Sequence, residues 1–93
     1  MSAVQAIIAK WDSPAEFGRD IGLTRYNHAH LMKLRMSIPP LHWPRVVQAS
    51  ELRGYGVTFE LLAEAHAADA DLRAAQRRQR LAPRDLSDET EAA

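Results

Sequence analysis

The chain has 93 residues, 46% of them hydrophobic, and twelve basic residues balance twelve acidic ones. This length suits one small domain with a packed core, and because cysteine is absent, no disulfide or thiolate metal site can support it. The apolar runs are too short for a transmembrane helix, and the start MSAVQAIIAKW lacks the basic and long apolar regions of a signal peptide. We therefore expect a cytoplasmic protein.

The charges are unevenly distributed along the chain. Residues 1–58 carry seven Lys or Arg and four acids, a net charge of +3, whereas residues 59–93 carry five Arg and eight acids, a net charge of −3. A field of this size permits binding to nucleic acid but does not require it.

Two helices are predicted before residue 22. The first, over 3–11, has four apolar residues on one helical face: Val4, Ile7, Ile8 and Trp11. The second begins after Ser13, a good N-cap followed by Pro14, and Glu16 completes the spacing of a capping box. It runs to about Ile21, and Gly22 suits the left-handed residue that ends a helix.

Three more helices follow. Thr24 is a plausible cap for a helix over about 25–36, which the Ile-Pro-Pro sequence at 38–40 ends. A fourth helix covers about 41–53 and is closed by a glycine. Thr58 caps a fifth, which consists of strong helix formers and is predicted to run unbroken to about Arg80. We expect an all-α fold.

The second and third helices have the features of a helix-turn-helix, whose second helix enters the DNA major groove. Phe17 and Ile21 supply the apolar residues of the first helix, and Gly18 leaves room for the crossing helix. Gly22 allows the turn, and Leu23 locks it into the core. A plain helical bundle remains the alternative.

Two registers are open for the third helix. The usual count from Gly22 places His28 and Leu31 inward, whereas a turn longer by one residue buries Ala29 and Met32 instead. In either register, a polar set occupies the start or outer side of this helix: Arg25, Tyr26, Asn27, His30 and Lys33.

We expect Arg25, Asn27 and His30 to read bases, since Arg pairs bidentately with guanine and Asn with adenine. Phosphate contacts are expected from Arg19, Lys33, Arg35 and Arg45. Tyr26 can instead pack on the preceding helix, Arg45 can be an ordinary solvated charge, and His28 is better explained as a half-buried histidine than as a reader.

The segment after the helix-turn-helix resembles a known pattern. Its elements are Ile38-Pro39, His42-Trp43, Val46-Val47 and Gly56-Val57-Thr58. Over about residues 3–65 the chain resembles compact Cro/CI-type regulators, among them YdaS-like and "carph-isopro" helix-turn-helix proteins of bacteria and prophages. The resemblance implies sequence-specific DNA binding in transcriptional control, usually as a dimer or with protein partners. The spacing from Gly22 to Ile38 is one residue longer than usual, and Met32 or Leu34 stands where such proteins often have Trp.

This reading divides the chain into a compact five-helix Cro/CI-like domain over 1–66, a helical extension over 67–82 and a disordered acidic tail over 83–93. A stripe of small apolar residues along the fifth helix predicts a homodimer: Leu61, Ala65, Ala68, Leu72 and Ala75. Fraying after about Ala70 is the alternative. The arginines at 73, 77, 78, 80 and 84 can contact DNA backbone or an acidic protein surface, or pair with the acidic tail.

No spacing in the chain indicates catalysis. His28 and His30 point to different sides of a helix, and His42 and His66 stand alone without a metal-binding motif. We expect no enzyme, no metal and no cofactor. The predicted function is a sequence-specific transcriptional regulator that binds double-stranded DNA on the nucleoid. The alternative is a helix-turn-helix protein-interaction module that acts on a partner regulator or RNA polymerase.

Overall fold

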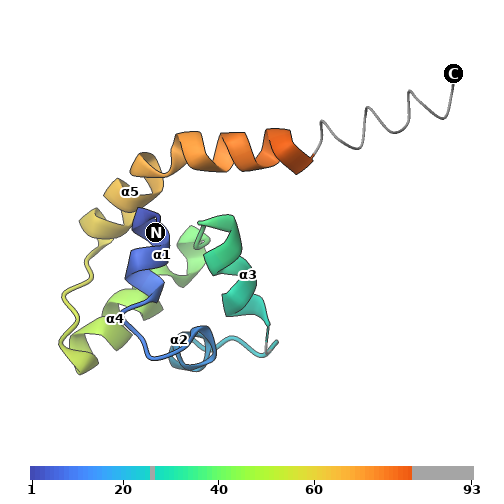
Figure 1. Cartoon of the computed structure of the whole chain (residues 1–93). Coiled ribbons are helices and arrows are strands. Elements are labelled where there is room, and N and C mark those ends of the chain that lie inside the picture. Colours follow the sequence, from blue (N-terminus) through green and yellow to red (C-terminus); the bar gives the residue numbers. More distant parts are fainter. Residues whose placement is uncertain (26, 81–93) are drawn as a thin grey trace, which may run out of the picture.

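The computed structural model describes residues 1–25 and 27–80, and this part of the chain is all-helical (Figure 1). Its helices are α1 (Ala3–Ile8), α2 (Pro14–Asp20), α3 (His28–Arg35), the 3-10 turn η1 (Pro40–His42), α4 (Trp43–Arg53) and α5 (Phe59–Ala68). Residues 70–80 form a further helical stretch, here called the 70–80 helix. The predicted disordered tail, 83–93, lies outside the described residues, and no described helix is long and apolar enough to cross a membrane.

The core lies where these helices meet. α2 packs on α3 and α4, and α1 packs on α3 and α5. The predicted stripe of α1 is confirmed, since all four of its residues are buried, although the helix ends at Ile8 and Trp11 belongs to the following turn. Trp11 packs edge-on against Phe17, with ring centroids 4.9 Å apart, and so joins α1 to α2.

Most of the predicted caps are confirmed. The hydroxyl of Ser13 accepts the N–H of Glu16 at 3.1 Å, and that of Thr58 accepts the N–H of Leu61 at 3.1 Å. The capping box predicted from Glu16 is only half formed, because its carboxylate binds Arg53 at 2.7 Å instead of returning to the cap.

The prediction of one unbroken helix from residue 59 to 80 is wrong, because α5 ends at Ala68 and Asp69 forms a turn. The carboxylate of Asp69 is buried and accepts the first N–H groups of α1, from Ala3 at 3.0 Å and from Val4 at 2.8 Å. Burial alone would raise the pKa of this carboxyl, but the hydrogen bonds from Val4, Ala3 and Ser2, together with the charge of Arg73, lower the pKa below its ordinary value. The carboxylate of Asp69 therefore caps the N-terminus of α1, although it lies more than sixty residues later in the sequence.

Candidate nucleic-acid interface

The α2–α3 unit has the close crossing that a helix-turn-helix needs. A Cβ placed on Gly18 would lie 3.2 Å from the Cβ of Ala29, so a larger side chain would push α3 away from α2. Gly22 has a φ of 83° and ends α2. The N–H of Leu23 donates to the carbonyl of Gly18 at 2.9 Å, and that of Gly22 to Arg19 at 3.2 Å, which completes a Schellman motif.

α3 begins later than predicted. It starts at His28, so Thr24 does not cap it, and Asn27 takes the cap position without a side-chain hydrogen bond. Ala29 and Met32 are buried, so the longer-turn register is the one observed. The physical reason is the Schellman turn, which directs Leu23 against the core, five residues before α3 starts at His28.

The turn and the start of α3 bring together four of the predicted site residues. A groove of about 410 Å³ is lined by Thr24, Arg25, Asn27, His28, Leu31 and Arg35. A second groove, of about 310 Å³, shares Thr24 and Arg25 with it and adds Arg19 from α2. Arg19, Arg25, Asn27 and Arg35 are all exposed, so one continuous surface presents three guanidinium groups and an amide.

His30 and Lys33 lie outside these two grooves. His30 is exposed, and the helical spacing places it on the outer side of α3 with Asn27 and Leu34. Lys33 is half-buried, and its carbonyl accepts the side-chain amide of Gln5 at 3.0 Å. Tyr26, the remaining predicted contact of this segment, lies outside the described residues.

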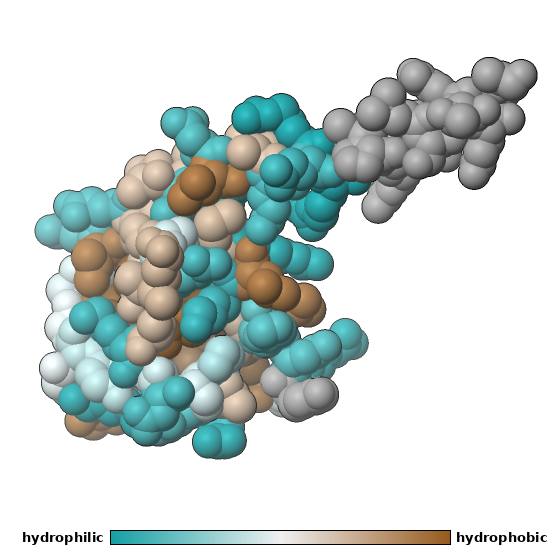
Figure 2. Space-filling view, in the orientation of Figure 1, coloured by the Kyte–Doolittle hydropathy of each residue, from teal (hydrophilic) through white to brown (hydrophobic). Residues whose placement is uncertain are grey.

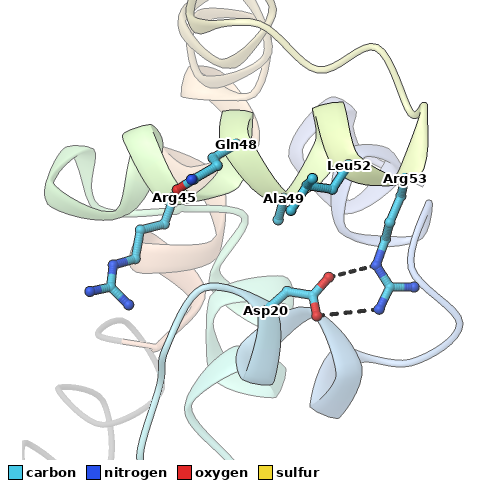
Figure 3. Close-up of a pocket in the computed structure, with 6 residues that line it drawn as sticks. All are labelled: Asp20, Arg45, Gln48, Ala49, Leu52 and Arg53. Carbon is cyan, nitrogen blue, oxygen red and sulfur yellow. Dashed lines mark hydrogen bonds and ion pairs between the residues drawn. The ribbon is translucent and has the colours of Figure 1, made fainter.

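Arg45 comes from α4 and reaches the turn. A Cβ on Gly22 would collide with its guanidinium, which therefore lies directly over the turn. Figure 3 shows the Arg45 side chain pointing away from Asp20 and Arg53, although all three line the same pocket. The structure thus adds a fourth exposed arginine to the surface formed by Arg19, Arg25 and Arg35.

The pocket in Figure 3 lies between α2 and α4 and has a volume of about 470 Å³. On one side of it, Arg53 binds the carboxylate of Asp20 through two nitrogens, at 2.6 and 3.2 Å. The hydrogen bond from Arg53 is the main cause that lowers the pKa of Asp20, and the indole of Trp11 donates to the same carboxylate at 2.8 Å. This carboxylate therefore accepts three hydrogen bonds, two from Arg53 and one from Trp11.

Arg53 also binds Glu16, so one guanidinium neutralises both acids of α2. Within residues 1–25 and 27–80, the contacts of Arg53 with Glu16 and Asp20 are the only ion pairs whose nitrogen and oxygen atoms lie within 4 Å of each other. The arginines around the turn therefore have no acidic partner among the described residues, and their positive potential is directed at solvent.

Two histidines that appear unrelated in the sequence lie together. The rings of His28 and His42 pack edge-to-face, with centroids 6.3 Å apart, although His42 stands alone in the sequence. Burial lowers the pKa of His42, and the nearby charges of His28 and Arg45 lower it further. His66 also has partners: its Nε2 accepts the N–H of Ile38 at 2.8 Å, and its Nδ1 lies 2.7 Å from the carbonyl of Leu62.

Arg53 was not among the predicted site residues, because its role depends on a contact between two helices. Its only sequence signal is the pair of acids at Glu16 and Asp20, one helical turn apart, which calls for a nearby cation. No group of three metal-ligating side chains occurs in the part of the chain that the structure describes. Comparisons with protein-family models, with curated proteins and with solved structures found no match.

Proposed function

We propose that this protein is a sequence-specific DNA-binding regulator of transcription, with a Cro/CI-like helix-turn-helix whose α3 lies in the major groove. The observation that carries the proposal is the cluster of exposed arginines around the turn: Arg19, Arg25, Arg35 and Arg45. They are left without acidic partners because Arg53 engages the acids of α2. Such a surface attracts a polyanion, and its arginines can contact phosphates on either side of a helix that enters the groove.

The base contacts fall to the residues nearest the start of α3. Arg25 and Asn27 line the same groove and are exposed, and His30 follows one turn later on the outer side. Asn can bind adenine and Arg can bind guanine through two hydrogen bonds each. The phosphate contacts come from the other basic side chains, Lys33, Arg19, Arg35 and Arg45.

The likeness to Cro/CI-type regulators is supported by the loop between α3 and α4. Ile38 is fully buried, and the indole of Trp43 donates to its carbonyl at 2.8 Å. The Ile-Pro and His-Trp elements thus hold the loop after α3 against the core. A regulator of this kind works on the nucleoid, in the cytoplasm.

A homodimer is part of the proposal, since two copies would read a site with dyad symmetry. The predicted stripe on the fifth helix is divided: Ala65 is buried and Leu61 packs on the core, whereas Ala68 and Leu72 are exposed. Figure 2 shows apolar atoms over α1 and the start of α5, where a groove of about 460 Å³ runs between the two helices. The exposed surface beside this groove is where a second copy would dock.

The second candidate is a protein-interaction module that docks on a partner regulator or RNA polymerase. It is favoured by two exposed apolar side chains, Leu34 of α3, which is 50% exposed, and Leu41 of η1, which is 76% exposed. Leu34→Ser and Leu41→Ser would abolish binding to such a partner. They would leave affinity for random DNA unchanged, because non-specific binding depends on phosphate contacts.

Titration of random-sequence duplex by fluorescence anisotropy at two salt concentrations tests the proposal. Affinity should fall steeply as salt rises, and Arg45→Ala should reduce the slope of log K against log salt by about 0.9. Arg78→Ala is the matched control, because it removes the same exposed charge from the 70–80 helix, outside the turn. No binding at low salt, or equal effects of the two variants, would contradict the proposal.

A further inference from the structure

The 70–80 helix is anchored on the last turn of α3. The guanidinium of Arg73 donates to the carbonyls of Met36, at 3.2 Å, and His66, at 2.6 Å. The side-chain amide of Gln76 donates to the carbonyl of Leu34 at 2.8 Å. In Figure 1 this helix, drawn in orange, passes the upper end of α3 and continues beyond it. These bonds fix its direction relative to α3.

The exposed arginines of the 70–80 helix divide between two sides. Residues three, four and seven apart share one side of a helix, so Arg80 lies on the side of Arg73 and Gln76, and Arg77 lies beside them. Arg80 is about 6 Å further along the axis than Gln76. Arg78 lies on the opposite side, seven residues from Asp71 and so on the same face as that acid.

The length of α3 indicates what lies at its far end. Its eight residues span about 12 Å at 1.5 Å each, which equals the width of about 12 Å of the major groove in B-DNA. Because the start of α3 is the base-reading end in the proposed function, a helix of this length carries its last turn to the edge of the groove, beside the sugar-phosphate backbone. The carbonyls of Leu34 and Met36, and the side chains that bind them, would then lie next to phosphates.

We propose that the 70–80 helix is a basic arm that contacts DNA phosphates beside the major groove through Arg77 and Arg80. This inference rests on the proposed function and extends the DNA surface beyond the helix-turn-helix. Both arginines are exposed, and neither has an ion pair within the described residues. Gln76 is the positioning residue, because it sets the distance between the arm and the last turn of α3.

The test is anisotropy titration of the full chain with random-sequence duplex, because phosphate contacts are independent of sequence. Arg77→Ala and Arg80→Ala should each weaken binding several-fold and reduce the salt slope by about 0.9, whereas Arg78→Ala should leave both unchanged. Thermal melts would confirm that all three variants are folded, as expected for exposed positions.

A double-mutant cycle tests the anchor. Gln76→Ala removes the bond to Leu34 and leaves those of Arg73, so the arm is held less firmly beside α3, and adding Arg80→Ala should then cost less affinity than it costs in the wild-type chain. If the wild-type chain binds duplex but Arg80→Ala and Arg78→Ala have equal effects, the proposed phosphate contacts of the arm are contradicted. The proposed helix-turn-helix interface is not affected by that result. If the wild-type chain does not bind duplex, the proposed function itself fails.

Discussion

The carboxylate of Asp69 accepts the backbone N–H of Val4 at 2.8 Å, a hydrogen bond between residues 65 positions apart. It joins the first turn of α1 to the point where α5 gives way to the 70–80 helix. The same helix binds the carbonyls at the end of α3. Asp69 therefore holds in place the support on which the proposed DNA-reading helix rests.

Asp69→Ala should destabilise the fold by about 2–3 kcal/mol, because it leaves the first N–H groups of α1 buried without an acceptor. Asp71→Ala is the matched control, since Asp71 is an exposed aspartate two residues further on. Urea unfolding followed by circular dichroism measures both. Equal losses in the two variants would show that the tertiary cap contributes nothing.

Lowering the pH should remove the contribution of Asp69 to the stability of the fold over a defined pH range. Its pKa is lowered in the folded chain from the ordinary value of 3.8, so the unfolded chain binds more protons in this range and stability falls as the pH falls. The contribution is complete well above 3.8 and is lost as the pH falls through the lower folded value. The stability gap between wild type and Asp69→Asn should therefore shrink between about pH 5 and pH 2. A gap that stays constant over that range would contradict the assignment.

Gly18→Val should cost about 1–3 kcal/mol of stability, since the new side chain would meet Ala29 and force α2 and α3 apart. Ala15→Val, at an exposed position of the same helix, is the control for placing valine in α2; helix propensity alone would favour Gly18→Val, because valine is a better helix former than glycine. Thermal unfolding compares the two. If Ala15→Val is as harmful as Gly18→Val, the close crossing is not the cause.

Asn27→Ala should cost about 1–3 kcal/mol on the preferred site and much less on random duplex, because it removes a base contact and no charge. Gln48→Ala removes the same kind of group from α4 and should leave the ratio of the two affinities unchanged. Competition titrations measure this ratio. An equal loss of affinity for both duplexes would show that Asn27 does not contact a base.

Local signals predicted much of the fold. Ser13, Pro14 and Gly22 place α2 and its turn correctly, and Thr58 marks the start of α5. Each of these residues acts on backbone groups only a few positions away, so its effect can be predicted from the neighbouring sequence. The start of α3 was misplaced because Thr24 has the chemistry of a cap, whereas the Schellman turn uses the following residues as a connection.

The contacts that arrange the candidate site could not be predicted, because they join distant parts of the chain. Arg53 is ordinary in its own helix and acquires a role only when α4 packs beside Glu16 and Asp20. Met36 adopts a left-handed conformation, with φ of 55°, at a position where a glycine is usual, although the Ile-Pro-Pro sequence after it correctly predicted where α3 ends. Gln76 and Arg73 supply hydrogen bonds to this end from more than thirty-five residues away.

Selection of bound duplexes from a random pool by the wild-type chain tests the proposal that α3 reads a DNA sequence. We expect successive rounds to enrich one motif, with purine contacts suited to Arg25 and Asn27, and dyad symmetry if two copies bind together. A pool that is retained at low salt without any enriched motif, or is not retained at all, would contradict it.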